Sequence, residues 1–170
     1  MRNLFFALWR IIHLCGGIYR SRSAMLFLLT VKMVYCDIAG QTNERAMMGA
    51  IIPGGVVCGN KVPTVIFPND TPGDRIYLWV GIVNSVAFDW LIRRIISTTV
   101  NYFLLLSVPI PQIEIDSSQA KTSISCTKLR SCVTDEYCRT NEMRDLRIRI
   151  EVAVAKACGL SLADIRFLFG

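Results

Sequence analysis

The chain has 170 residues, enough for the core of one domain, and 52% of them are hydrophobic, with a mean hydropathy of +0.42. This apolar fraction is high for a free-standing soluble domain, so we expect part of the chain to meet a membrane or a partner surface. Residues 1–35 carry five basic residues and no acid, whereas residues 36–170 carry 14 basic and 13 acidic residues. The net charge of +6 therefore does not by itself indicate nucleic-acid binding beyond residue 35.

Residues 1–30 form an apolar and basic N-terminal extension. Its two apolar runs, 4–14 and 24–31, are each shorter than the ~20 residues that a transmembrane helix needs. The composition is compatible with a signal peptide or with a basic segment lying on a membrane surface. A third interpretation is a start site inside a longer gene, or a frame error, so that the extension is not native to the fold. We favour this third interpretation.

Short β-strands are predicted after the extension, because β-branched apolar runs alternate there with turn residues. The first is a candidate edge strand, and the four segments are 31–35, 47–52, 56–58 and 65–67. Lys61 lies in the turn before the last of them and is a candidate phosphate ligand.

The polar loop between the first two strands contains the residue types that read DNA. Thr42, Asn43 and Arg45 can contact phosphates and base edges. A purely structural interpretation also fits, in which Asn43 caps the turn and Arg45 pairs with Asp37 or Glu44. Residue type alone favours the structural interpretation.

One long buried helix is predicted over residues 74–96, where apolar residues recur at helical spacing on nearly every face. Thr71 and Pro72 form its expected start. Arg93 and Arg94 point about 100° apart, so one can reach a phosphate while the other pairs with Asp89 or Asp74. Both also suit the negative end of the helix dipole.

Residues 100–108 have the composition of a strand that ends at prolines, with Asn101 near a possible nucleotide. Residues 112–127 are expected to be a linker, and 128–139 are weakly helical. A clear helix follows over 141–158 and ends at Gly159. Ser161 and Asp164 have the spacing of a capping box for a last short helix.

The predicted fold class is therefore α/β, with a small mixed β-sheet packed on a long central helix and a helical C-terminal tail. We divide the chain into the extension 1–30, an α/β segment 31–116, and the linker and C-terminal helices 117–170.

The seven cysteines do not indicate a structural metal or a disulfide framework. Cys126, Cys132 and Cys138 recur every six residues, whereas zinc sites show tighter pairs and a fourth ligand. The only histidine, His13, is distant in sequence. An odd number of irregularly spaced cysteines is typical of reduced cytoplasmic thiols.

Several motifs of this chain resemble the target-recognition region of large restriction-modification enzymes. The motifs are Asn84-Ser85, Phe88-Asp89, Arg93-Arg94, Asn101-Tyr102-Phe103 and Pro109-Ile110-Pro111. The family consists of adenine-specific DNA methyltransferases of type II, often fused to a nuclease as type IIG enzymes. Segments 32–60 and 144–169 resemble flanking parts of the same region, so the resemblance covers residues 31–170 in order.

The resemblance implies that the chain is a DNA-binding fragment of such an enzyme, with double-stranded DNA as its partner. A separate methyltransferase or nuclease chain would supply catalysis, with S-adenosylmethionine as the cofactor of that family. The implied contact residues are Thr42, Asn43, Arg45, Lys61, Arg93, Arg94 and Asn101. The family commonly has arginine at the position of Cys36 and threonine at that of Ala46, so two polar groups are missing from this loop.

The sequence lacks the motifs of an enzyme of this family. It contains no Pro-Pro for the base-flipping motif, no Gly-x-Gly loop for S-adenosylmethionine, and no nuclease metal motif. We therefore expect no catalytic or metal site in this chain, and a cytoplasmic location. Two alternatives stay open, a non-functional remnant and a small membrane-associated protein anchored by residues 1–31.

Overall fold

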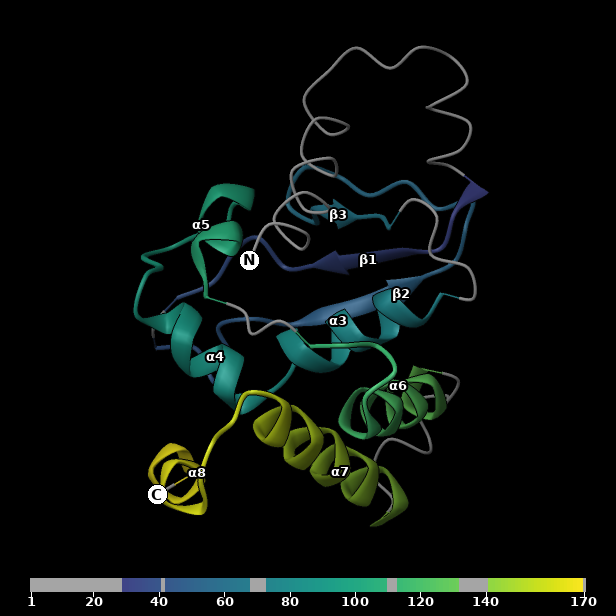
Figure 1. The fold of residues 1–170 in the computed structure, drawn as a ribbon. Coiled ribbons are helices and arrows are strands. Elements are labelled where there is room, and N and C mark those ends of the chain that lie inside the picture. Colours follow the sequence, from purple (N-terminus) through teal and green to yellow (C-terminus); the bar gives the residue numbers. More distant parts are fainter. Residues whose placement is uncertain (1–28, 41, 68–72, 110–112, 132–140, 170) are drawn as a thin grey trace.

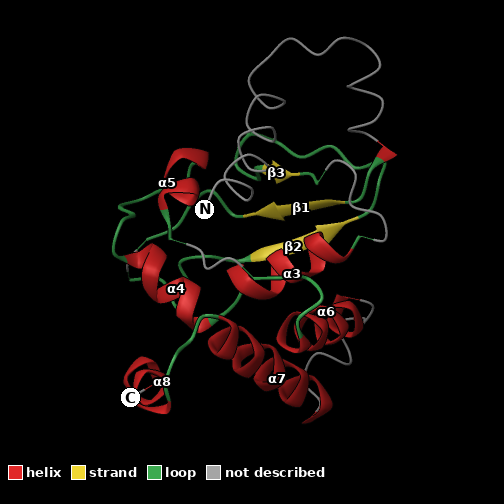
Figure 2. Ribbon diagram, in the orientation of Figure 1, coloured by secondary structure: helices red, strands yellow, loops and turns green. Residues whose placement is uncertain are grey.

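The computed structural model describes residues 29–40, 42–67, 73–109, 113–131 and 141–169. Most of the predicted extension 1–30 lies outside these ranges, as do the predicted capping residues Thr71 and Pro72. The described part contains a small antiparallel sheet and a set of helices (Figures 1 and 2). The predicted α/β class is confirmed, although the sheet is antiparallel rather than mixed.

The sheet has the strand order β2-β1-β3, with β1 at Lys32–Tyr35, β2 at Gly49–Ile52 and β3 at Thr64–Val65. Met33 pairs with Ile51 on one side and with Val65 on the other. The prediction of β1 as an edge strand is wrong, because β1 is central and all four of its residues are buried. The segment 56–58 is not a strand, so the predicted strand there is also wrong.

The expected single helix over 74–96 is broken into α3, Asp74–Val83, and α4, Val86–Arg93, whose axes differ by 62°. Ser85 causes the break. Its backbone is extended, with ψ 152°, and its Oγ accepts the N–H of Phe88 at 3.2 Å while donating to the carbonyl of Ile82 at 2.7 Å. A serine at a cap position competes with the helical backbone for hydrogen bonds, so α4 starts anew.

The predicted strand over 100–108 is instead helix α5, Tyr102–Ser107. Asn101 caps this helix, because its Oδ1 accepts the N–H of Leu104 at 2.9 Å. The predicted linker over 112–127 is also wrong, since helix α6 spans Ser118–Ser131. Its small residues pack against Gly81 of α3, where an added Cβ would lie 2.6 Å from Ser123 Oγ.

The two C-terminal helices are α7, Asn141–Ala157, and α8, Leu162–Phe169. Gly159 ends α7 with a left-handed φ of 70°. The predicted capping box is present, since Ser161 N donates to Asp164 Oδ2 at 2.8 Å and Asp164 N donates to Ser161 Oγ at 3.2 Å. Both helices are therefore bounded by the residues that the sequence indicated.

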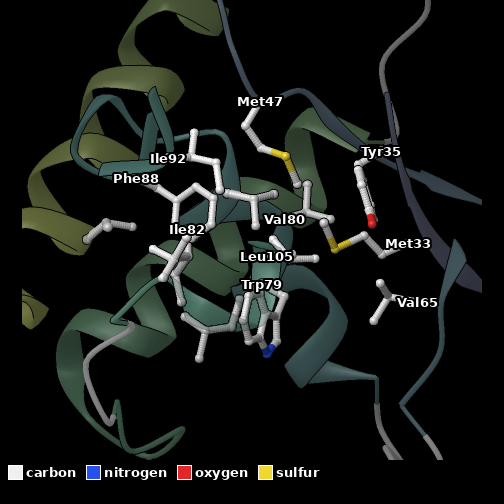
Figure 3. Packing of buried hydrophobic residues seen from close by; sticks show 14 of the residues in the cluster. Met33, Tyr35, Met47, Val65, Trp79, Val80, Ile82, Phe88, Ile92 and Leu105 are labelled. Atoms are coloured by element: carbon white, nitrogen blue, oxygen red, sulfur yellow. The ribbon is translucent and has the colours of Figure 1, made fainter. Parts of the chain in front are cut away.

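The hydrophobic core lies between the sheet and helices α3, α4 and α5, while α6 and α7 pack on α3 (Figure 1). Figure 3 shows the core side chains gathered around α3, including Met33, Tyr35, Met47, Val65, Trp79, Val80, Ile82, Phe88, Ile92 and Leu105. Taken singly, no helix in the described ranges has the length and apolarity to cross a membrane, although α3 and α4 pass that criterion together as a bent pair.

Candidate functional site

A buried carboxylate lies beneath the polar loop that connects β1 to β2. Asp89 of α4 is only 6% exposed. Its Oδ1 accepts the backbone N–H groups of Ala46 and Met47 at 2.8 and 2.9 Å, and its Oδ2 accepts Arg93 Nε at 2.7 Å. A buried charge needs such partners, so Asp89 fixes the end of the loop against α4.

Two arginines complete the contact between the loop and the helices. Arg45 Nε lies 3.7 Å from Asp89 Oδ1, and its Nη2 donates to the backbone carbonyl of Asn84. Arg93 Nη2 donates to the backbone carbonyl of Glu44 at 2.7 Å. Both arginine side chains are at most a quarter exposed. We call Arg45, Asn84, Asp89 and Arg93 the loop anchor.

Asn84 joins the break between α3 and α4 to the edge of the sheet. Its Nδ2 donates to the carbonyl of Gly49 at 2.7 Å, and its Oδ1 accepts the N–H of Gly49 at 2.8 Å. β2 pairs with β1 on its other side. The amide of Asn84 therefore takes the place of a neighbouring strand at this residue of β2.

The loop held by this anchor has an exposed polar tip. Thr42 and Asn43 are exposed, and Asn43 N donates to Gly40 O at 3.2 Å. The loop lies beside the α4–α5 connection, because Ala39 N donates to Thr98 O at 3.0 Å. The two segments thus form one edge of the molecule (Figure 1).

Two further predicted contacts are exposed cations. The Lys61 side chain is 60% exposed and its Nζ lies 3.6 Å from Asp37 Oδ2. Arg94 is exposed at the end of α4, with its guanidinium 3.8 Å from the centre of the Trp90 ring. We call the four exposed predicted contacts Thr42, Asn43, Lys61 and Arg94 the polar edge.

The structure separates the seven predicted DNA contacts into two groups. Arg45 and Arg93 belong to the loop anchor, and Asn101 caps α5, so these three side chains already have partners within the chain. The remaining four form the polar edge. Of the two structural alternatives given for Arg93, pairing with Asp89 is the one observed.

Glu151 of α7 was not predicted as part of this region. Its Oε2 accepts the N–H of Val86, the first residue of α4, at 2.9 Å. The sequence indicates only that Glu151 can pair with Arg147, four residues earlier on the same helix. No local pattern predicts its contact with Val86, which is 65 residues away. The contact ties α7 to the break between α3 and α4.

The pKa of Glu151 is raised above that of an ordinary carboxyl. Burial is the largest cause, opposed in part by the Val86 N–H and by the positive charges of Arg45, Arg147 and Arg130. The folded protein therefore holds this proton more tightly than the unfolded chain does. The contribution to stability falls as pH rises from the unfolded pKa through the raised folded pKa.

Glu151→Gln is expected to remove the loss of stability that Glu151 causes as pH rises, and so to raise the free energy of unfolding at pH 7. Glutamine keeps an oxygen that can accept the Val86 N–H, but it carries no charge to bury. Urea unfolding of both proteins between pH 4 and pH 8 measures the effect. A difference between them that does not grow with pH would contradict the assignment.

Within the described ranges, no three His, Cys, Asp or Glu side chains are grouped closely enough to hold a metal ion. Cys126 is buried in α6, whereas Cys132 and Cys138 of the evenly spaced cysteine triplet lie outside the described residues. Comparison of the chain with protein-family models and with curated proteins gives no match.

Proposed function

We propose that the chain is a DNA-binding fragment of a type II restriction-modification DNA methyltransferase, derived from its target-recognition region. The observation that carries the proposal is the loop anchor, in which a buried carboxylate and two arginines hold a loop with an exposed polar tip. Rigid presentation of polar side chains lowers the entropic cost of binding. A loop that only connects two strands does not need to be held this firmly. The loop anchor therefore suits a recognition role.

The polar edge has the chemistry for both kinds of DNA contact. Lys61 and Arg94 supply positive charge for phosphates, which position a protein on the duplex. Thr42 and Asn43 at the loop tip are suited to base edges or sugars, and asparagine can pair with adenine through its N6 and N7 atoms. In this proposal Arg45 and Arg93 hold the loop in place and Asn101 orients α5, while catalysis with S-adenosylmethionine belongs to a separate chain. A protein of this kind would work in the cytoplasm.

The proposal predicts salt-dependent binding of duplex DNA that is specific to the polar edge. Replacing both Lys61 and Arg94 by glutamine is expected to weaken binding at low ionic strength. If each residue contacts one phosphate, the slope of log K against log salt should fall by about 1.8, since each contact contributes about 0.9. Fluorescence anisotropy with a labelled duplex over a series of salt concentrations measures both effects.

The matched control is the double variant Lys156→Gln and Arg166→Gln. These residues are exposed on α7 and α8, and the net charge changes by the same amount. The control should retain the wild-type slope. Equal losses in the two double variants would show that only overall charge matters, and the absence of any salt-dependent binding would contradict the proposed function.

A further inference from the structure

A cavity of about 260 Å³ lies between the edge of β2 and helices α3, α6 and α7. Figure 1 shows β2 on one side of α3 and α6 and α7 on the other. The lining of the cavity includes none of the four residues of the polar edge. It is smaller than the roughly 300–1,000 Å³ of typical pockets for drug-sized ligands, so it suits a small ligand.

The charged lining of the cavity favours an anion. Arg130 of α6 and Arg147 of α7 both contribute to it, together with Glu151. Glu151 is the acidic residue of this lining, and its carboxylate already accepts the Val86 N–H. Arg45 adds a third positive charge near Glu151. Positive charge in a recess with low-dielectric walls attracts anions more strongly than the same charge on a flat surface.

A buried hydroxyl in the lining has no partner among the described residues. Thr127 is 3% exposed, and its Oγ1 makes no hydrogen bond there. A buried polar atom without a partner is rare and calls for an explanation. Thr127 Oγ1 lies 3.0 Å from the position of a Cβ added at Gly81, which also lines the cavity. This distance is shorter than an ordinary van der Waals contact, so the hydroxyl is enclosed where α6 packs closely on α3 and is not accessible from the cavity.

The edge of β2 supplies a backbone donor on the same side. Gly49 directs its N–H and C=O away from β1, toward the Asn84 side chain. Groups two residues apart on a strand point in the same direction, so the N–H of Ile51 also points away from β1. Ile51 lines the cavity.

We propose that this cavity binds a phosphate-like oxyanion. Arg147 supplies a charge-assisted hydrogen bond, which is stronger than a bond between neutral groups. The Ile51 N–H supplies a further donor, and Arg130 adds positive charge. The ligand is a free phosphate or a phosphate group of a nucleic acid, since the donors suit either one. The site does not require the polar edge to bind DNA.

Isothermal titration of the full chain with inorganic phosphate, at constant ionic strength set by chloride, tests the site. Wild-type protein is expected to bind phosphate saturably. Arg147→Gln should weaken binding by about tenfold or more, the effect of losing a hydrogen bond from a charged group. The matched control is Arg149→Gln, because Arg149 is exposed on the same helix and does not line the cavity.

Two further variants separate binding from folding. Thr127→Val keeps the shape of the side chain and removes a hydroxyl that is not accessible from the cavity, so it should leave both phosphate binding and the unfolding temperature unchanged. Glu151→Gln removes the competing negative charge and should tighten binding, which a damaged fold would not do. Equal weakening by Arg147→Gln and Arg149→Gln, or no saturable binding by the wild type, would overturn the proposal.

A short DNA duplex added to the titration identifies the source of the anion. Competition between duplex and phosphate, lost in Arg147→Gln, would support a phosphate group of DNA as the natural ligand. Saturable phosphate binding that the duplex leaves unchanged would support a free phosphate. This second result keeps the anion site even if the polar edge binds no DNA, so failure of the proposed function and failure of the site remain distinguishable.

Discussion

Replacing Asp89 by alanine is expected to lower the free energy of unfolding by about 3–5 kcal/mol, the usual cost of removing one partner from a buried ion pair. Alanine would leave the N–H groups of Ala46 and Met47 without their acceptor. It would also leave Arg93 and Arg45 without a counter-charge at the base of the loop. Urea unfolding of the full chain, followed by circular dichroism, measures the change. Since small domains have a total stability of about 5–15 kcal/mol, this substitution should be severe.

Two comparisons test whether the effect comes from the buried charge. Asp89→Asn keeps one oxygen, which can accept both backbone N–H groups as Oδ1 does, but it loses the charge and the acceptor for Arg93. Its cost should therefore be smaller than that of Asp89→Ala. Lys61→Gln breaks the Lys61–Asp37 pair, whose lysine side chain is 60% exposed, and should cost less than about 1 kcal/mol. An Asp89→Ala variant as stable as Lys61→Gln would show that the loop does not depend on the anchor.

The elements that could be predicted from the sequence are those determined by neighbouring residues. The boundaries of α7 and α8 depend on Gly159, Ser161 and Asp164, which act within one helical turn. The Arg93–Asp89 pair is also local, because the two residues are four apart on one helix. Signals of this range are visible in a single sequence.

The helices that the sequence did not predict depend on contacts between distant segments. Helix α6 is rich in serine and threonine, which are poor helix formers in isolation. Its Ala120, Ser123 and Thr127 are buried, and small side chains there allow α6 to approach Gly81 closely. In α5 the composition of residues 102–106 suits a strand equally well, and the cap at Asn101 decides in favour of a helix.

The residues of the candidate site are also joined across long separations in sequence. Arg45 and Asn84 are 39 residues apart in sequence, and Gly49 and Asn84 are 35 apart. A buried asparagine side chain needs a partner, but no local pattern identifies the partner of Asn84 as Gly49. The sequence therefore indicated polar residues for the region, while the structure determined which of them hold the loop and which are exposed.

Asn84→Asp is expected to lower the free energy of unfolding by about 1–3 kcal/mol at neutral pH, the cost of a buried polar group without a partner. Aspartate can still accept the N–H of Gly49, but an ionised oxygen would replace the Nδ2 that donates to the carbonyl of Gly49 at 2.7 Å. Two acceptors would then face each other. A protonated carboxyl can donate to that carbonyl, so the loss should shrink as pH falls and the new carboxyl takes up a proton. Urea unfolding over pH 4–8 follows this recovery.

The matched control is Asn43→Asp, which makes the same chemical change at an exposed residue of the loop between β1 and β2. It should stay within about 0.5 kcal/mol of the wild type and show little dependence on pH. If both variants lose the same stability, the added negative charge alone would explain the effect. A loss confined to Asn84→Asp and reversed by acid would instead show that the bidentate contact with Gly49 holds β2, the helix break and the loop anchor together. The polar edge and the anion cavity both border these elements, so the two proposed sites would share one structural support.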